Sequence, residues 1–240
     1  MVVRAEAGLY FRQLLSGTDF AVGDPLAAQM VNFAYLIGDR ATHQAMIVDP
    51  AYGVADLIGI AGADGMDIVG ALVTHHHPDH VGGSMMGYSI EGVAELLSVR
   101  PVPIHAHRDE VDSICRITGA APGDVVGHHG GDIVEVGDVP IEMLHTPGHT
   151  PGSQCFLVGR RLVSGDTLFL EGCGRTDLPG GDPGALYNSL RHLASLPDDM
   201  AVFPGHRYSA PASGSMEVVK ATNVVFRPST EAEWMAAFGR

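Results

Sequence analysis

Short apolar runs that end in turn-forming residues recur along the chain, and this pattern predicts β-strands. The predicted strands span residues 29–37, 44–48, 69–73, 102–105, 133–136, 141–144, 154–158, 161–163 and 200–203. Apolar residues at helical spacing predict helices at residues 54–61, 91–97, 108–118, 215–222 and 230–238. The clearest helix begins with an N-cap and a proline, Asp182 and Pro183, and repeats leucine at Leu186, Leu190 and Leu193.

The order of these elements predicts the fold class. Strands come first in clusters and then alternate with helices, twice over, which suits two sheets packed face to face with helices outside. We therefore predict an α/β fold in four layers. The length of 240 residues and the lack of a Ser- or Pro-rich linker favour a single domain over residues 1–240.

Composition narrows the class of protein further. The 31 glycines and 15 prolines follow no three-residue period, so they indicate many tight turns and exclude a collagen-like chain. The three cysteines, Cys115, Cys155 and Cys173, are widely separated and form no CxxC pair. This spacing argues against a disulfide framework and against a thiolate zinc site.

The net charge and the N-terminal segment predict which partners the protein binds and where in the cell it lies. The 28 acidic residues exceed the 14 basic residues, and the net charge of −14 disfavours nucleic acid and anionic membranes as partners. The N-terminal residues 1–17 carry Arg4, Glu6 and Arg12 and contain no apolar core, and no run of about 18 apolar residues follows. We therefore expect a soluble, cytoplasmic protein.

Histidine is unusually abundant, with 13 residues, and the densest group lies in the segment THHHPDHVGG, which follows a predicted strand. In an extended segment His75 and His77 project to one side, because side chains alternate along a strand. Pro78 then ends the strand and turns Asp79 and His80 back toward the same space. Four potential metal ligands therefore converge within one loop.

Neutral imidazoles and carboxylates are ligands that Zn²⁺, Mn²⁺ and Fe²⁺ accept, and each metal takes three or four of them. One loop cannot saturate two metals, so further donors must come from elsewhere. Three candidates lie in Gly- or Pro-bracketed turns after predicted strands: His149 in HTPGHTPGS, Asp166 in SGDTLF and His206 in FPGH.

Taken in order, HHHPDH, HTPGHTPGS, SGDTLF and FPGH resemble the signature motifs of the metallo-β-lactamase fold, over residues 30–225. The resemblance implies an αββα sandwich of two mixed sheets and a site for two divalent metal ions, zinc first, with iron or manganese as alternatives. It also implies the ligands. They are His75, His77 and His149 for the first metal, Asp79, His80 and His206 for the second, and Asp166 as the bridge.

Two cations that share a water lower its pKa toward ~7, which makes hydroxide available to attack a carbonyl. Such a site predicts a metal-dependent hydrolase. Asp79 is the candidate catalytic residue, because an oxygen left free by the metal could orient the water or carry a proton.

Two further features resemble the glyoxalase II and persulfide dioxygenase branch of the family: the run GCGRTD after Asp166, and Tyr208 after His206. In that branch the residues matching Arg175 and Tyr208 face glutathione, and a guanidinium suits an anionic substrate arm. The first hypothesis is therefore a hydrolase of a thioester or a similar small acyl substrate. The alternative is a mononuclear iron persulfide dioxygenase that acts on glutathione persulfide.

Some features of the sequence differ from the family pattern, and they favour or disfavour individual hypotheses. Only 34 residues follow His206, whereas glyoxalase II carries a sizeable C-terminal helical domain, so glutathione itself is disfavoured. Asp177 stands where glyoxalase II has a tyrosine, as in the dioxygenases. A non-catalytic metal-binding scaffold is disfavoured because Asp166 and His206 are both present. The oligomeric state, a homodimer included, stays open.

Several residues are not predicted as ligands. His76 and His145 are expected to support neighbouring ligands, and His105 and His107 lack a carboxylate companion. His128 and His129 are expected in a solvated loop, and Cys173 in a glycine turn. Residues 84–101, with Met85, Met86 and Tyr88, are interpreted as a surface helix with a loop or as an apolar lid.

Overall fold

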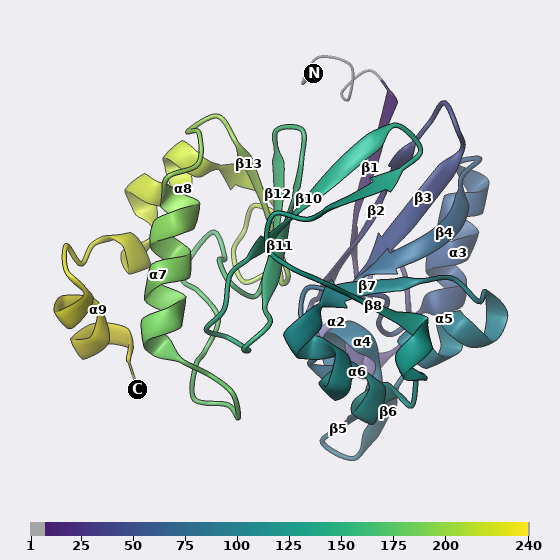
Figure 1. The fold of residues 1–240 in the computed structure, drawn as a ribbon, viewed down its shortest axis with the longest axis horizontal. Helices are drawn as coiled ribbons and strands as arrows, with labels where there is room; N and C mark the ends of the chain where they lie inside the picture. The colour runs from purple at the N-terminus through teal and green to yellow at the C-terminus, as the bar shows by residue number, and fades with distance from the viewer. Residues whose placement is uncertain (1–7, 240) are drawn as a thin grey trace.

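Two sheets lie face to face at the centre of the molecule, with helices on both outer faces, and the computed structural model describes them within residues 8–239 (Figure 1). Arg4 and Glu6, which entered the prediction about the N-terminal segment, lie outside the described residues.

The first sheet has six strands in the order β1-β2-β3-β4-β7-β8. They are β1 (Leu9–Leu15), β2 (Phe33–Asp39), β3 (Gln44–Val48), β4 (Asp67–Leu72), β7 (Ile104–His107) and β8 (Val125–His128). Strands β3, β4, β7 and β8 pair in parallel, whereas β1, β2 and β3 pair antiparallel. The sheet is therefore mixed.

The second sheet has six strands in the order β14-β13-β12-β11-β10-β9. They are β9 (Ile133–Val136), β10 (Val139–His145), β11 (Gln154–Val158), β12 (Arg161–Gly165), β13 (Ala201–Pro204) and β14 (Gly214–Ser215). Strands β12 and β13 pair in parallel, and every other pair in this sheet is antiparallel.

Helices cover the outer face of each sheet, and Figure 1 shows α3 beyond the first sheet and α7 beyond the second. The first group is α3 (Val54–Ala63), α5 (Val93–Val99) and α6 (Val111–Thr118), and the second is α7 (Pro183–Ala194), α8 (Met216–Thr222) and α9 (Glu231–Phe238). Short helices complete the chain: α2 (Pro25–Met30), α4 (Pro78–Val81), η1 (Arg108–Glu110), η2 (Pro122–Asp124) and η3 (Val224–Phe226).

An apolar core fills the space between the sheets. Ile37, Val48 and Leu72 of the first sheet and Phe156 and Val163 of the second are all buried in it. Separate apolar cores lie under the helices of each outer face. These layers confirm the predicted αββα arrangement, because each sheet buries one face on the other sheet and one face on helices.

The best-defined helix forms as predicted. The Asp182 side chain accepts a hydrogen bond from the Ala185 backbone N–H at 2.9 Å and caps α7. Leu186, Leu190 and Leu193 are buried under the second sheet.

The prediction of a strand over residues 29–37 is wrong at its start, because α2 continues to Met30. The Asp24 carboxylate caps this helix by accepting from the Leu26 and Ala27 N–H groups, and Pro25 follows as at the start of α7. Val31 ends the helix in the left-handed region at φ 49°. Strands β1 and β8 were not predicted.

Residues 84–101 contain the predicted helix, α5, but a hairpin stands in place of the predicted loop. A two-stranded hairpin, β5 (Gly83–Met85) and β6 (Tyr88–Ile90), turns through Met86 and Gly87, both at positive φ, and leads into α5. Met86 and Tyr88 are exposed at the tip. The lid role stays a prediction. Within residues 8–239 no helix is long and apolar enough to cross a bilayer.

Replacing Phe156 by alanine tests the contact between the sheets. The ring is fully buried between Met143 and Val163 of the neighbouring strands. We expect Phe156→Ala to lower the free energy of unfolding by about 3–5 kcal/mol in urea denaturation, because the surrounding side chains only partly fill the cavity that the missing ring leaves. Ile133→Ala, at a position 59% exposed, is the control and should cost less than about 1 kcal/mol. Equal losses would contradict this description of the core.

Candidate metal centre

The predicted ligands follow strands that end at one edge of the sandwich. In the first sheet, His75 and the residues up to His80 follow β4. In the second sheet, His149, Asp166 and His206 follow β10, β12 and β13. Strand β10 is antiparallel to β11, and β11 to β12, so β10, β12 and β13 all run in one direction. Their carboxyl ends therefore lie at the same edge as the loop after β4, and all seven predicted ligands meet there.

Three imidazoles form the first group. The His77 Nδ1 atom lies 3.1 Å from His75 Nε2 and 3.0 Å from His149 Nε2. The rings stand nearly perpendicular to one another, with centroids 4.6–4.7 Å apart. Ligand nitrogens ~2.0–2.1 Å from a tetrahedral zinc are about 3.3 Å apart, so this spacing fits a cation of that size.

The second group combines two imidazoles with a carboxylate. The Nε2 atoms of His80 and His206 lie 3.2 Å apart, and the Asp79 Oδ2 atom lies 3.5 Å from the first and 3.4 Å from the second. All three residues are buried. This donor set also fits a divalent cation.

Asp166 lies between the two groups. One carboxylate oxygen, Oδ2, is 3.7 Å from His149 Nε2 and 3.3 Å from His206 Nε2, and the other, Oδ1, is 3.5 Å from His80 Nε2. The buried Oδ1 atom has no hydrogen-bond partner within residues 8–239. A buried carboxylate oxygen in this condition is costly unless a cation or a proton compensates it.

Hydrogen bonds to the opposite ring nitrogen orient three of the histidines. The Nδ1 atoms of His149 and His206 lie 2.7 Å and 2.8 Å from backbone carbonyl oxygens, those of Arg175 and Met30. The Nδ1 atom of His80 lies 2.9 Å from the Asp49 carboxylate. When Nδ1–H donates in this way, each Nε2 atom faces the centre and is the nitrogen that can bind a cation once it carries no proton.

Asp49 and Asn32 were missed by the sequence analysis. Asp49 directly follows β3 and also accepts from the Thr74 backbone N–H and hydroxyl at 2.8 Å and 2.7 Å, so it fixes the start of the histidine loop. Its place after a strand and before a proline could have identified it. The Asn32 amide donates to the Asp79 carbonyl at 3.0 Å and to its carboxylate at 3.2 Å. Nothing in the local sequence marks Asn32.

The two groups differ in protonation. Burial and the neighbouring imidazoles, His149 first, lower the pKa of His77 to about 4. The pKa of His75 is also well below its usual value, for the same reasons. Burial alone would lower the pKa of His80, but Asp79, Asp166 and Asp49 outweigh it and raise that pKa to about 10.

The Arg175 and Tyr208 side chains lie at the surface of this region. Arg175 is 63% exposed and forms a two-bond ion pair with Asp177, with both N–O distances 2.6 Å. Tyr208 stacks on the His206 ring, with centroids 4.7 Å apart and planes at 5°, and its ring is 5.0 Å from Phe169. The structure therefore brings both residues to the rim of the centre.

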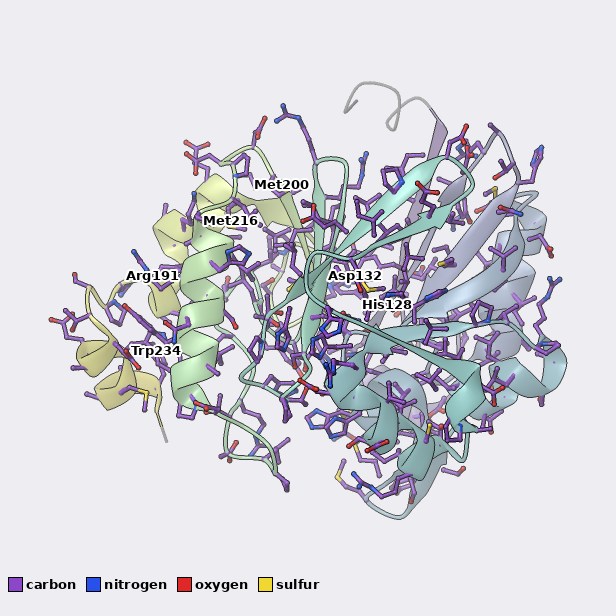
Figure 2. All side chains as sticks on the ribbon, viewed as in Figure 1. His128, Asp132, Arg191, Met200, Met216 and Trp234 are labelled. Carbon is purple, nitrogen blue, oxygen red and sulfur yellow. The ribbon has the colours of Figure 1, made fainter. Side chains whose placement is uncertain are left out.

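Gly174 allows the GCGRTD loop to approach His149 closely. A Cβ atom at Gly174 would lie 2.1 Å from the Asp166 carbonyl oxygen and 3.0 Å from the His149 ring, so only glycine fits. A cavity of about 460 Å³ lies against this loop and is walled on its far side by Val225, Trp234 and Phe238. Figure 2 labels Trp234 on α9, where its ring lies 5.9 Å from Tyr187 of α7.

Two of the histidine predictions need correction. His107 does have a carboxylate companion, because Asp109 lies 3.6 Å from its Nδ1 atom and His145 stacks on its ring at 3.8 Å and 9°. Parallel stacked rings cannot both point an in-plane lone pair at one cation, so this arrangement disfavours a metal site. His128, labelled in Figure 2, is not simply solvated, because its Nε2 atom lies at hydrogen-bond distance, 2.9 Å, from the Nδ1 atom of His105.

The surroundings of His76 and Cys173 can also be compared with their predicted roles. The His76 ring turns away from the centre to the Glu110 carboxylate, in agreement with the expected supporting role. Burial raises the pKa of the Cys173 thiol to about 12, which disfavours a reactive thiolate.

Comparison with known proteins places the chain in a family. The sequence profile of the metallo-beta-lactamase superfamily matches residues 29–206, about three quarters of the chain. The chain belongs to this superfamily. Members bind divalent metals, and the histidine and aspartate groups described above are the corresponding clusters here.

Two curated relatives differ in length. A hydroxyacylglutathione hydrolase from Rhodopseudomonas palustris is 39% identical over 181 residues, which cover 75% of this chain but only 64% of the relative. The probable polyketide biosynthesis zinc-dependent hydrolase BaeB of Bacillus velezensis is 29% identical over 201 residues and 82% of both chains. The chain thus spans less than two thirds of the hydroxyacylglutathione hydrolase.

Among solved structures, ETHE1 from Myxococcus xanthus is similar with a TM-score of 0.77 and 29% identity, covering 96% of this chain and 90% of that one. These similarities confirm both the fold class and the resemblance to the glyoxalase II and persulfide dioxygenase branch.

Metal binding should release more protons at the second group than at the first. At pH 7 a pKa of about 10 keeps His80 protonated, so a cation that binds its Nε2 atom must displace a proton. His75 and His77 are already neutral, since their pKa values are lowered.

This difference can be measured by titrating metal-free His149→Ala and His206→Ala variants with zinc calorimetrically, in two buffers of different ionisation enthalpy. The first variant leaves only the second group intact, and it should release about one proton more per zinc than the other. Equal proton release would contradict the assigned protonation states.

Proposed function

We propose that this protein is a hydrolase that uses two divalent metal ions, acting on a thioester or a similar small acyl substrate. The observation that carries the proposal is the position of Asp166, whose buried carboxylate contacts histidines of both groups. A carboxylate shared in this way is suited to bridge two cations.

In this proposal the first ion is held by His75, His77 and His149, and the second by Asp79, His80 and His206. Zinc is the first choice, because tetrahedral sites of imidazole and carboxylate suit it and because the relative BaeB is named a zinc-dependent hydrolase. When bound, the two ions supply a water of lowered pKa and a positive charge that polarises the substrate carbonyl.

The chain's own residues complete the proposed chemistry. The Asn32 amide donates to the Asp79 Oδ2 atom and holds the carboxylate in place. Because the Asp79 side chain is 10% exposed, its carboxylate can orient a water and accept a proton from that water. The ring of Tyr208 covers His206 on the solvent side and gives the substrate an apolar surface beside the metals.

The proposed substrate class is inferred from the exposed residues beside the metal centre. Arg175 presents an exposed guanidinium, paired with Asp177, on the loop whose backbone carbonyl contacts the His149 ring. The similarity to hydroxyacylglutathione hydrolases supports a thioester, whereas the shorter match to their length leaves glutathione unspecified. An anionic thioester of a small thiol is therefore the proposed substrate.

Removing Asp166 tests the metal centre. We expect Asp166→Ala to lose bound metal and to reduce kcat/KM on a panel of acyl thioesters by about 10³-fold or more, since both ions lose a ligand. Elemental analysis of the purified protein and thiol release give the two measurements. Asp177→Asn, at an exposed carboxylate on the rim, is the control for metal content. Unchanged metal content in Asp166→Ala would contradict the bridging role.

Replacing Arg175 tests the anionic substrate. Arg175→Ala should raise KM for anionic thioesters by about 10-fold with little change in kcat, because one charge-assisted contact is lost from ground and transition states alike. Arg160→Ala removes a comparable exposed ion pair, with Asp199, at the opposite end of β12 from Asp166, and should change neither constant. A KM that stays constant for charged and neutral thioesters would contradict the role.

A second candidate function is a mononuclear iron persulfide dioxygenase. The ion pair between Arg175 and Asp177, in place of the tyrosine of glyoxalase II, favours it, as does the 90% coverage of ETHE1. Iron-loaded protein would then consume oxygen with glutathione persulfide in an oxygen electrode, and zinc-loaded protein would not. The homodimer, the cytoplasmic location and the exclusion of nucleic acid and membranes stay predictions.

A further inference from the structure

Glu110 is a fully buried carboxylate outside the proposed ligand set. It ends η1, the short helix that follows β7 of the first sheet, and its exposed fraction is 0%. A buried carboxylate is stable only when hydrogen bonds or charges compensate it. Its partners therefore indicate what it does.

The two oxygens of Glu110 bind two different metal-ligand loops. Oε2 accepts from the His76 backbone N–H at 2.7 Å and contacts the His76 ring Nδ1 atom. Oε1 accepts from the Gly152 backbone N–H at 2.7 Å and from the Thr150 hydroxyl at 2.9 Å. One side chain thus connects the loop after β4 in the first sheet with the loop after β10 in the second.

These bonds lie beside the first histidine group. His76 stands between His75 and His77 in the chain, and Thr150 directly follows His149. The relative position of the two loops determines how far His77 Nδ1 lies from His149 Nε2, which is 3.0 Å here. Glu110 is therefore placed to set this distance.

The hydrogen bonds require an acceptor at both oxygens, which an ionised carboxylate supplies. Each oxygen accepts from a backbone N–H, and a backbone N–H cannot become an acceptor. A glutamine at this position would point its amide hydrogens at one of the two backbone donors. It would therefore keep the volume of the side chain and lose the connection on one side.

Gly152 provides the space for Glu110. A Cβ atom at Gly152 would lie 2.6 Å from Glu110 Cγ and 2.8 Å from Oε1, so any larger residue would displace the carboxylate. The close approach gives a second and independent way to disturb the same contact.

We propose that Glu110 is a positioning residue that holds the two loops of the first histidine group at metal-binding distance. The proposal rests on the proposed function, since it assumes a cation at that group. The second group depends on other contacts, namely Asp49 on His80, Asn32 on Asp79 and the Met30 carbonyl on His206. The effect of Glu110 should therefore be selective.

The experiment measures zinc affinity by chelator competition for each group separately. Glu110→Gln is combined with His206→Ala, which leaves the first group, and with His149→Ala, which leaves the second. We expect the first combination to bind zinc about 10–100-fold more weakly than His206→Ala alone, and the second to match His149→Ala. Gly152→Ala in the same two backgrounds should repeat this result.

Asp39→Asn is the matched control. Asp39 is also a buried carboxylate that accepts two backbone N–H groups, from Ala41 and Asp138, but it lies at the other end of β2 from Asn32. Thermal unfolding of the metal-free proteins compares the stability of the variants. Asp39→Asn should lower stability without changing the zinc affinity of either group.

Loss of affinity at both groups in proportion to lost stability would overturn the proposal, and so would unchanged affinity at the first group. If Glu110→Gln does not fold, the Gly152→Ala comparison decides by the same criteria. Failure of the unsubstituted protein to retain zinc, iron or manganese would instead overturn the proposed function, and the role of Glu110 with it.

Discussion

The position of every candidate ligand depends on the apolar contact between the two sheets. His75 to His80 belong to the first sheet, whereas His149, Asp166 and His206 belong to the second. Hydrogen bonds between the sheets, such as that from the Gln154 backbone N–H to the Thr74 carbonyl at 3.0 Å, connect the two groups locally, and the packing of the buried face of each sheet on the other sets their overall separation. Because a close-packed core tolerates little displacement, it can fix ligand atoms to within the few tenths of an ångström that a cation requires.

Polar contacts around the centre then orient the side chains that the apolar core places. His80 is held by Asp49 and Asp79 by Asn32, whereas Glu110 and Thr150 hold the loops beside the first histidine group, and all four of these partners are buried. Buried polar groups are stable only when their hydrogen bonds are satisfied, so each partner restricts the ligand that it holds to one orientation. Asp166 Oδ1 departs from this pattern, since it lacks a partner within the described residues and faces the histidines of both groups. The centre therefore combines hydrogen-bonded surroundings with a carboxylate oxygen that faces the His80 ring at 3.5 Å, and a bound cation would replace the His80 proton as its counter-charge.

The exposed residues beside the metal centre differ from the metal ligands in burial and in their place in the fold. Arg175 and Tyr208 are exposed and lie on loops, whereas the ligands are largely buried at strand ends. Loops positioned by a rigid scaffold can vary without loss of the fold, so members of one superfamily can share a metal centre and differ in substrate. This division explains why relatives with different names match the same part of the chain.

The sequence by itself determined the local features of this protein. The start of α7 at Asp182, its leucine spacing and the convergence of His75 to His80 in one loop all follow from residues a few positions apart, whose geometry is fixed by backbone periodicity and turn chemistry. The order of the four motifs identified the family and hence the distant ligands. Only the tertiary structure decided which residues support them. Asn32 meets Asp79, Glu110 meets Gly152, and His107 stacks on His145, across 38 to 47 positions of sequence. Such contacts depend on strand order and on the packing of one sheet against the other, which no local pattern of residues encodes.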